Sequence, residues 1–217
     1  MSTDATLLKP LGARVRRLFG PAGYRRLLQT LGYTQTPWCR VVMNRATQEL
    51  VSALPCNELD VIEISGTQWE QEELGFRSYR TVDFPQYDIC AGPLGEAICD
   101  LVIAEQVFEH IERPHLAARN VYAMLRPKGA LLITTPFLVK YHAFPRDLYR
   151  WTEDGLRVLL EDSGFGEVVT GSWGNSCCLR ADMSADLKWT MYHPLLHSLH
   201  NEPQFPVSVW AMGKKSC

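Results

Sequence analysis

The sequence predicts an α/β fold built on a largely parallel sheet. Three apolar segments of strand length, residues 59–66, 100–104 and 130–135, alternate with segments of helical pattern. Continuous apolar runs of this kind are typical of strands that are covered on both sides. Because strands that alternate with helices form right-handed parallel crossovers, we expect helices on both faces of the sheet.

Length and composition fit one globular domain with extensions. The 217 residues are 46% hydrophobic and 21% charged, which is ordinary for a globular chain. Apolar runs are too short to cross a bilayer and no signal-peptide pattern is present, so we expect a cytoplasmic protein without a membrane partner. The seven cysteines include no Cys-x-x-Cys pair, and their odd number favours reduced thiols over a disulfide framework.

Charge is spread unevenly along the chain. Residues 1–48 hold eight Arg or Lys and one acid, Asp4, giving +7, so the remaining residues carry −9 of the net −2. An acidic body disfavours nucleic acid and anionic membrane as partners, and docking of the basic segment onto its own domain is the favoured explanation. We therefore divide the chain into a basic helical extension and candidate lid, residues 1–48, and a main domain, residues 49–217, with an insert at about 174–204.

The remaining segments are placed by their apolar spacing and by helix-stop signals. Helical pieces are predicted at 14–19 and 24–31, separated by a break at Gly20-Pro21, and at 45–54. A short polar helix is expected at 67–74, and longer helices at 114–125 and 152–162, the last with Thr152 as its N-cap. Two late strands are expected at 168–173 and 206–212.

Two predicted strands end in a carboxylate. Glu63 lies near the end of the first run, and Asp83 ends a short run, residues 78–83, about twenty residues further on, the spacing at which α/β folds bind a ribose. We therefore expect Asp83 to accept hydrogen bonds from a ribose diol and Glu63 to lie near a cationic group of the same ligand. Asp88 is placed to accept from an exocyclic amine or, alternatively, to cap the next helix.

The insert contains three histidines at helical spacing. His193, His197 and His200 are 4 and 3 residues apart, but only Glu202 accompanies them at ligand spacing. Zinc sites normally have a more complete ligand set, so no metal is predicted here.

Several segments together resemble the class I S-adenosylmethionine-dependent methyltransferases: residues 61–66, Asp83, Asp88, residues 99–111 and residues 124–132. The resemblance covers roughly residues 58–170. It implies a Rossmann-like seven-stranded sheet with helices on both faces and an antiparallel last strand, for which residues 206–212 are suited. It also implies S-adenosyl-L-methionine as the cofactor.

The resemblance assigns cofactor contacts residue by residue. It implies roles for Glu63, Ser65 and Gly66 in the first loop, for Asp83 at the ribose, for Asp88 at the adenine, and for Glu105 and Gln106 on the methionine side. The family usually has three alternating glycines after the first acid, whereas Ser65, Gly66 and Thr67 supply only one. Serine and threonine are small, so we expect this loop still to allow close approach of a ligand to the backbone.

Transfer to an oxygen nucleophile usually requires a base, for which Glu109, His110, His142 and Asp147 are the candidates. His142 lies in a polar and aromatic loop, residues 141–151, and is favoured, with His110 as the second candidate and Asp147 orienting His142 or contacting the substrate. Glu109 would need burial to raise its pKa towards neutrality. Some related families bind a metal through Glu-x-x-Glu-His, but Gln106 replaces the first carboxylate, so no metal is predicted.

The function that these observations predict is O-methylation of a small metabolite, such as a sugar or a secondary metabolite, by a biosynthetic transferase. The alternative is a catalytically silent member of the fold that binds a nucleoside or a partner protein. A nicotinamide oxidoreductase is disfavoured because Gly-x-Gly-x-x-Gly is absent. The sequence leaves the oligomeric state and the methyl acceptor open.

Overall fold

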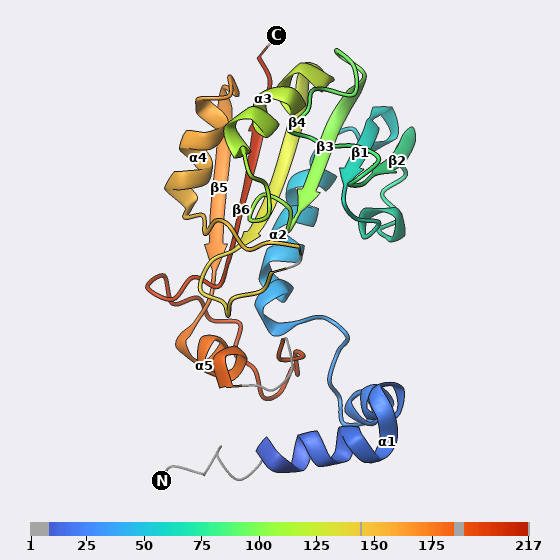
Figure 1. The fold of residues 1–217 in the computed structure, drawn as a ribbon. Helices are drawn as coiled ribbons and strands as arrows, with labels where there is room; N and C mark the ends of the chain where they lie inside the picture. The colour runs from blue at the N-terminus through green and yellow to red at the C-terminus, as the bar shows by residue number, and fades with distance from the viewer. Residues whose placement is uncertain (1–8, 144, 185–188, 217) are drawn as a thin grey trace.

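The computed structural model describes residues 9–143, 145–184 and 189–216, and a six-stranded sheet lies at its centre (Figure 1). The strands are β1 (Asp60–Ile64), β2 (Ser78–Val82), β3 (Cys99–Glu105), β4 (Leu125–Pro136), β5 (Glu167–Trp173) and β6 (Ser208–Lys214). Their order is β2-β1-β3-β4-β6-β5, with β6 antiparallel to both of its neighbours and the other pairs parallel. The α/β class and the antiparallel last strand are thus confirmed.

The predicted seventh strand is not found among the described residues. Residues 83–98, which connect β2 to β3, form turns and coil. This connection contains two prolines, Pro85 and Pro93, and two glycines, Gly92 and Gly95. Proline cannot donate to a strand ladder and glycine weakens a strand, so the segment cannot supply a regular edge strand.

Among the helices of the described chain, some cover the two faces of the sheet, as predicted, and others lie beyond its end (Figure 1). They are α1 (Lys9–Thr30), α2 (Val41–Ser52), α3 (Pro114–Met124), α4 (Glu153–Glu161) and α5 (Ser176–Ser184), with 3-10 turns η1 (Trp38–Arg40), η2 (Cys56–Glu58) and η3 (Trp69–Gln71). The predicted break is confirmed, because Gly20 has φ 68° and ψ 171° within α1. Thr152 caps α4 by accepting from the N–H of Gly155 at 3.0 Å. Only η3 forms where a short helix is predicted over 67–74.

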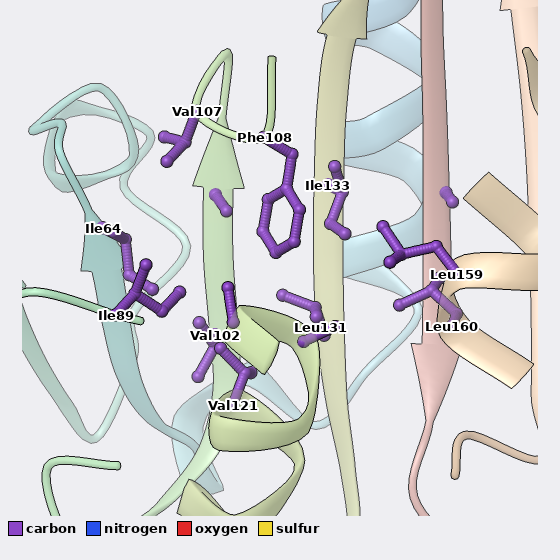
Figure 2. Close-up of a cluster of buried hydrophobic side chains, with 14 of the residues drawn as sticks. Ile64, Ile89, Val102, Val107, Phe108, Val121, Leu131, Ile133, Leu159 and Leu160 are labelled. Atoms are coloured by element: carbon purple, nitrogen blue, oxygen red, sulfur yellow. The ribbon is translucent and has the colours of Figure 1, made fainter. Parts of the chain in front are cut away.

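Two apolar layers cover the sheet. On one face, α3 and α4 pack on alternate strand residues, and Figure 2 shows Leu159 and Leu160 on one side and Val121 on the other side of Leu131 and Ile133. On the opposite face, Val51 of α2 packs with the intervening residues of β1, β3 and β4. The inner strands are therefore buried on both sides, which explains their continuous apolar sequence.

The chain between α1 and α2 packs on the insert. Trp38 stacks on His197 with ring centroids 4.1 Å apart, and its indole N–H donates to the carbonyl of Ser198 at 3.0 Å. His193 Nε2 lies 3.0 Å from the carbonyl oxygen of Leu31. These histidines thus join the leading segment to the insert, while α1 lies beyond the end of the sheet at which the parallel strands terminate (Figure 1). None of the described helices is long and apolar enough to cross a membrane.

Candidate active site

The first loop, between β1 and η3, is organised around Glu63. This carboxylate is fully buried and accepts hydrogen bonds from the N–H groups of Gln68 at 3.2 Å and Trp69 at 3.1 Å, and from the hydroxyl of Tyr79. A Cβ atom on Gly66 would lie 2.2 Å from Glu63 Oε1, so only glycine allows the loop to pass this closely. Glu63 therefore holds the loop in place. Its hydrogen-bond donors in the structure are groups of the protein itself.

Ser65 and Asp83 meet at the ends of β1 and β2. The hydroxyl of Ser65 donates to Asp83 Oδ1 at 2.8 Å, and the N–H of Ser65 donates to the carbonyl of Val82 at 2.8 Å. Ser65 has φ +58°, a conformation that glycine normally supplies, so here a serine provides the loop geometry expected of the missing glycine. Both side chains are exposed, and Asp83 Oδ2 has no hydrogen bond within the described parts of the chain.

Asp88 forms a local turn. Its Oδ1 accepts from the N–H of Cys90 at 2.8 Å, and its carbonyl accepts from Ala91 at 2.9 Å. The side chain therefore caps a turn, which is close to the alternative role predicted for it, and the residue is exposed.

Glu105 connects three distant segments at the end of β3. Its side chain is only 8% exposed; Oε1 lies 3.2 Å from Arg40 Nη1, and Oε2 accepts from the indole N–H of Trp69 at 3.2 Å. Burial raises the pKa of Glu105, and the Arg40 guanidinium opposes that rise. Arg40 and Trp69 are not among the residues predicted from sequence, because nothing local in either segment indicates that it approaches β3.

Gln106 follows with φ +56° and is held along β4. Its backbone N–H donates to the carbonyl of Thr134 at 2.9 Å, and its side-chain amide donates to Thr134 Oγ1 at 3.2 Å. The residues predicted for the methionine side thus lie beside the ends of β3 and β4, with Gln106 fixed by its own strand neighbour.

The segment after Gln106 anchors a buried carboxylate. Val107 and Phe108 are buried, and Figure 2 shows Phe108 pointing into the core beside Ile133. The next residue, Glu109, is fully buried, and neither of its oxygens has a hydrogen-bond partner among the residues that the structure describes. Burial raises the pKa of Glu109 to about 7. The condition under which Glu109 could serve as a base near neutrality is therefore met.

His110 lies beside this carboxylate, and His142 lies next to His110. Nε2 of His110 is 3.6 Å from Glu109 Oε1, its Nδ1 contacts the carbonyl of Arg146, and its ring meets the His142 ring edge-to-face with centroids 5.3 Å apart. Both ring nitrogens of His110 thus face protein groups. The structure brings the two predicted histidines together, and His142, which is partly buried, also meets the Trp189 ring edge-to-face with centroids 5.9 Å apart.

Asp147 fixes the loop that carries His142. Both of its oxygens pair with the guanidinium of Arg150, and Oδ2 accepts from the backbone N–H of His142 at 2.9 Å. The Arg150 guanidinium lowers the pKa of Asp147, so this carboxylate is ionised. Asp147 therefore positions the backbone at His142.

A family model and solved structures of methyltransferases are similar to this chain. Residues 44–131 match the family model described as a methyltransferase domain. No curated protein matches the sequence. An Archaeoglobus fulgidus SAM-dependent methyltransferase has a TM-score of 0.52 at 15% identity, over 82% of this chain and 94% of its own. The Haemonchus contortus phosphoethanolamine N-methyltransferase 2, solved with phosphomonomethylethanolamine and S-adenosylhomocysteine, has a TM-score of 0.54 at 11% identity, over 80% of this chain and 53% of its own.

Proposed function

Since the chain has the fold of the class I S-adenosylmethionine-dependent methyltransferases, we propose that it transfers a methyl group from S-adenosyl-L-methionine to an oxygen of a small metabolite. The observation that carries the proposal is the Ser65–Asp83 pair. It places an exposed carboxylate with one unbonded oxygen beside a tight glycine-containing loop, at the adjoining ends of β1 and β2. Nucleoside ligands of α/β folds bind at such strand ends.

The residues at this edge fit the cofactor. Asp83 Oδ2 can accept from a ribose hydroxyl, while Ser65 holds Oδ1 in a fixed direction. Gly66 allows the loop backbone to approach a ligand closely, and Glu63 holds the loop by accepting the Trp69 N–H. Asp88 would accept from the adenine amine, and Glu105 and Gln106 would line the methionine side. The cofactor, when bound, supplies an electrophilic methyl group on a sulfonium.

The protein must then align the acceptor and receive its proton. We assign proton acceptance to His142, in the loop after β4, because histidine titrates near neutrality and its backbone is fixed by Asp147. The His110 ring meets the His142 ring edge-to-face with centroids 5.3 Å apart, and its Nε2 lies 3.6 Å from Oε1 of Glu109, whose pKa is raised by burial to about 7. His110 and Glu109 thus support His142, and Asp147 positions the loop.

A small acceptor is supported by the charge of the domain. Residues 49–217 carry −9, which disfavours a polyanionic substrate such as RNA. The Haemonchus contortus N-methyltransferase is solved with phosphomonomethylethanolamine, a small molecule, which supports a small acceptor here. The acceptor that we propose is a hydroxyl group of a sugar or a secondary metabolite. The alternative function is that of a catalytically silent member of the fold that binds a nucleoside or a partner protein.

The proposal is tested by incubating the protein with S-adenosylmethionine and a panel of hydroxylated sugars and secondary metabolites. Formation of S-adenosylhomocysteine is followed, and products are examined by mass and NMR for the methylated atom. We expect turnover with at least one hydroxyl acceptor and an O-methyl product. Cofactor binding without transfer to any acceptor would favour the silent alternative, and an N-methyl product would reject the oxygen assignment.

A further inference from the structure

A pocket separate from the strand ends lies between the start of α3 and the end of the loop after β4. Its volume is about 440 Å³, within the usual range for small-molecule sites. It is lined by Glu112, Arg113, Pro114, His115, Arg119 and the aromatic pair Tyr149 and Trp151. None of these residues has a part in the proposed transfer reaction.

Two guanidinium groups in this pocket lack a counter-charge. Arg113 and Arg119 are exposed, and across the described ranges neither side chain has an ion pair or a hydrogen bond. The one acid in the pocket, Glu112, is paired with Arg146. The pocket therefore has a net positive charge from arginines, whose planar fork suits phosphate and carboxylate oxygens.

An aromatic surface also lines the pocket. Tyr149 and Trp151 are stacked, with ring centroids 5.3 Å apart and planes at 27°. The hydroxyl of Tyr149 donates to the carbonyl of Glu112 at 3.3 Å, and the indole N–H of Trp151 donates to the carbonyl of Phe108 at 3.4 Å. Because both rings are held by the chain, a planar ligand could bind against them with little loss of side-chain freedom.

We propose that this pocket binds a small anion that carries an aromatic ring, with its phosphate or carboxylate on Arg113 and Arg119 and its ring on the Tyr149–Trp151 surface. This site is distinct from the cofactor crevice, which is built from the ends of β1 and β2. The proposal therefore extends beyond the methyl-transfer assignment and does not depend on it.

Phenyl phosphate is a suitable probe because it combines both groups and contains no nucleoside. In calorimetric titrations of the full chain, phenyl phosphate should bind about five-fold more tightly than inorganic phosphate, since the ring adds an aromatic contact. Arg113→Ala and Arg119→Ala should each weaken its binding about ten-fold, as expected for loss of a charged hydrogen bond. Arg80→Ala, another exposed arginine without a partner in the described structure, should have no effect.

The aromatic half of the site has its own variants. Tyr149→Ala should abolish the preference for phenyl phosphate over inorganic phosphate, whereas Tyr149→Phe should retain it. A saturating amount of S-adenosylhomocysteine should not displace the probe. The site assignment is rejected if phenyl phosphate does not bind, if S-adenosylhomocysteine competes with it, or if correctly folded Arg113 and Arg119 variants bind it as the wild type does.

Discussion

Arg40 and Glu105 form an ion pair, with Nη1 and Oε1 3.2 Å apart, that joins the basic leading segment to the carboxyl end of β3. The arginine side chain is 20% exposed and the glutamate side chain 8% exposed. The other oxygen of Glu105 is bonded to the indole of Trp69 in the first loop. The leading segment is thus attached to the site through η1.

Replacement of Arg40 by Ala should destabilise the protein by about 2–4 kcal/mol, because it leaves a nearly buried carboxylate without its counter-charge. Glu105→Gln in the same chain should restore part of this loss, since the amide carries no charge to compensate. Urea denaturation at pH 7 measures both effects. Arg45→Ala, an exposed arginine on α2, is the matched control. Equal stabilities for the Arg40 and Arg45 variants would show that the ion pair contributes nothing.

Deletion of residues 1–30 should leave a folded domain that binds S-adenosylhomocysteine but turns over poorly. The deletion removes α1 and a net charge of +5, while η1 with Arg40 remains. None of the described side chains of α1 belongs to the buried clusters, so the core should survive. Circular dichroism, calorimetry and the methyl-transfer assay separate these effects. Full activity of the truncated protein would refute a covering role for α1.

His142→Ala should lower kcat by about 10²-fold while cofactor affinity stays nearly intact, because loss of a general base affects the transfer step alone. His200→Ala, an exposed histidine of the insert, serves as the control and should retain wild-type kcat. A decrease below about three-fold at saturating substrate would mean that the acceptor is activated by another group.

The buried carboxyl group of Glu109 should make the stability of the folded protein depend on pH. Its pKa is raised from the usual 4.5 to about 7, so between these values the folded protein holds a proton that the unfolded chain releases. Its contribution to stability is therefore largest at low pH and decreases as pH rises through 7, by up to about 3 kcal/mol. Glu109→Gln removes this dependence. As pH rises from 5 to 8, the free energy of unfolding of the variant should therefore increase relative to that of the wild type.

Urea denaturation at both pH values tests this prediction. Glu96→Gln, at an exposed glutamate, provides the control and should change little with pH relative to wild type. A stability difference for Glu109→Gln that is the same at pH 5 and pH 8 would show that the native carboxylate titrates normally.

Local sequence patterns predicted the regular elements well. The apolar run 100–104 forms β3, residues 114–125 correspond to α3, and Thr152 caps α4. These features could be predicted because a buried strand and a helix cap each depend on residues that are close together in the sequence. The seventh strand was inferred from resemblance and is absent from the described residues, since the connection after β2 has no strand pattern of its own.

The site could be predicted only in part. Ser65, Asp83 and Gln106 lie at strand ends, so their positions followed from the strands. The partners of Glu105, by contrast, come from 65 and 36 residues earlier in the chain, and no local pattern specifies such contacts. Sequence patterns also do not give the direction of a side chain, so the hydrogen bonds that Glu63 accepts from two N–H groups of its own loop could not be predicted.

Calorimetric titration of S-adenosylhomocysteine into the wild type and Asp83→Ala tests the central claim most directly. We predict binding to the wild type and a loss of about ten-fold or more in the alanine variant, because a charge-assisted hydrogen bond to a ribose is worth about 1.5–3 kcal/mol. Asp83→Asn should lose less, and Asp162→Ala, at an exposed aspartate after α4, should bind as the wild type does. Failure of the wild type to bind, or unchanged affinity in Asp83→Ala, would contradict the placement of a nucleoside cofactor at the ends of β1 and β2.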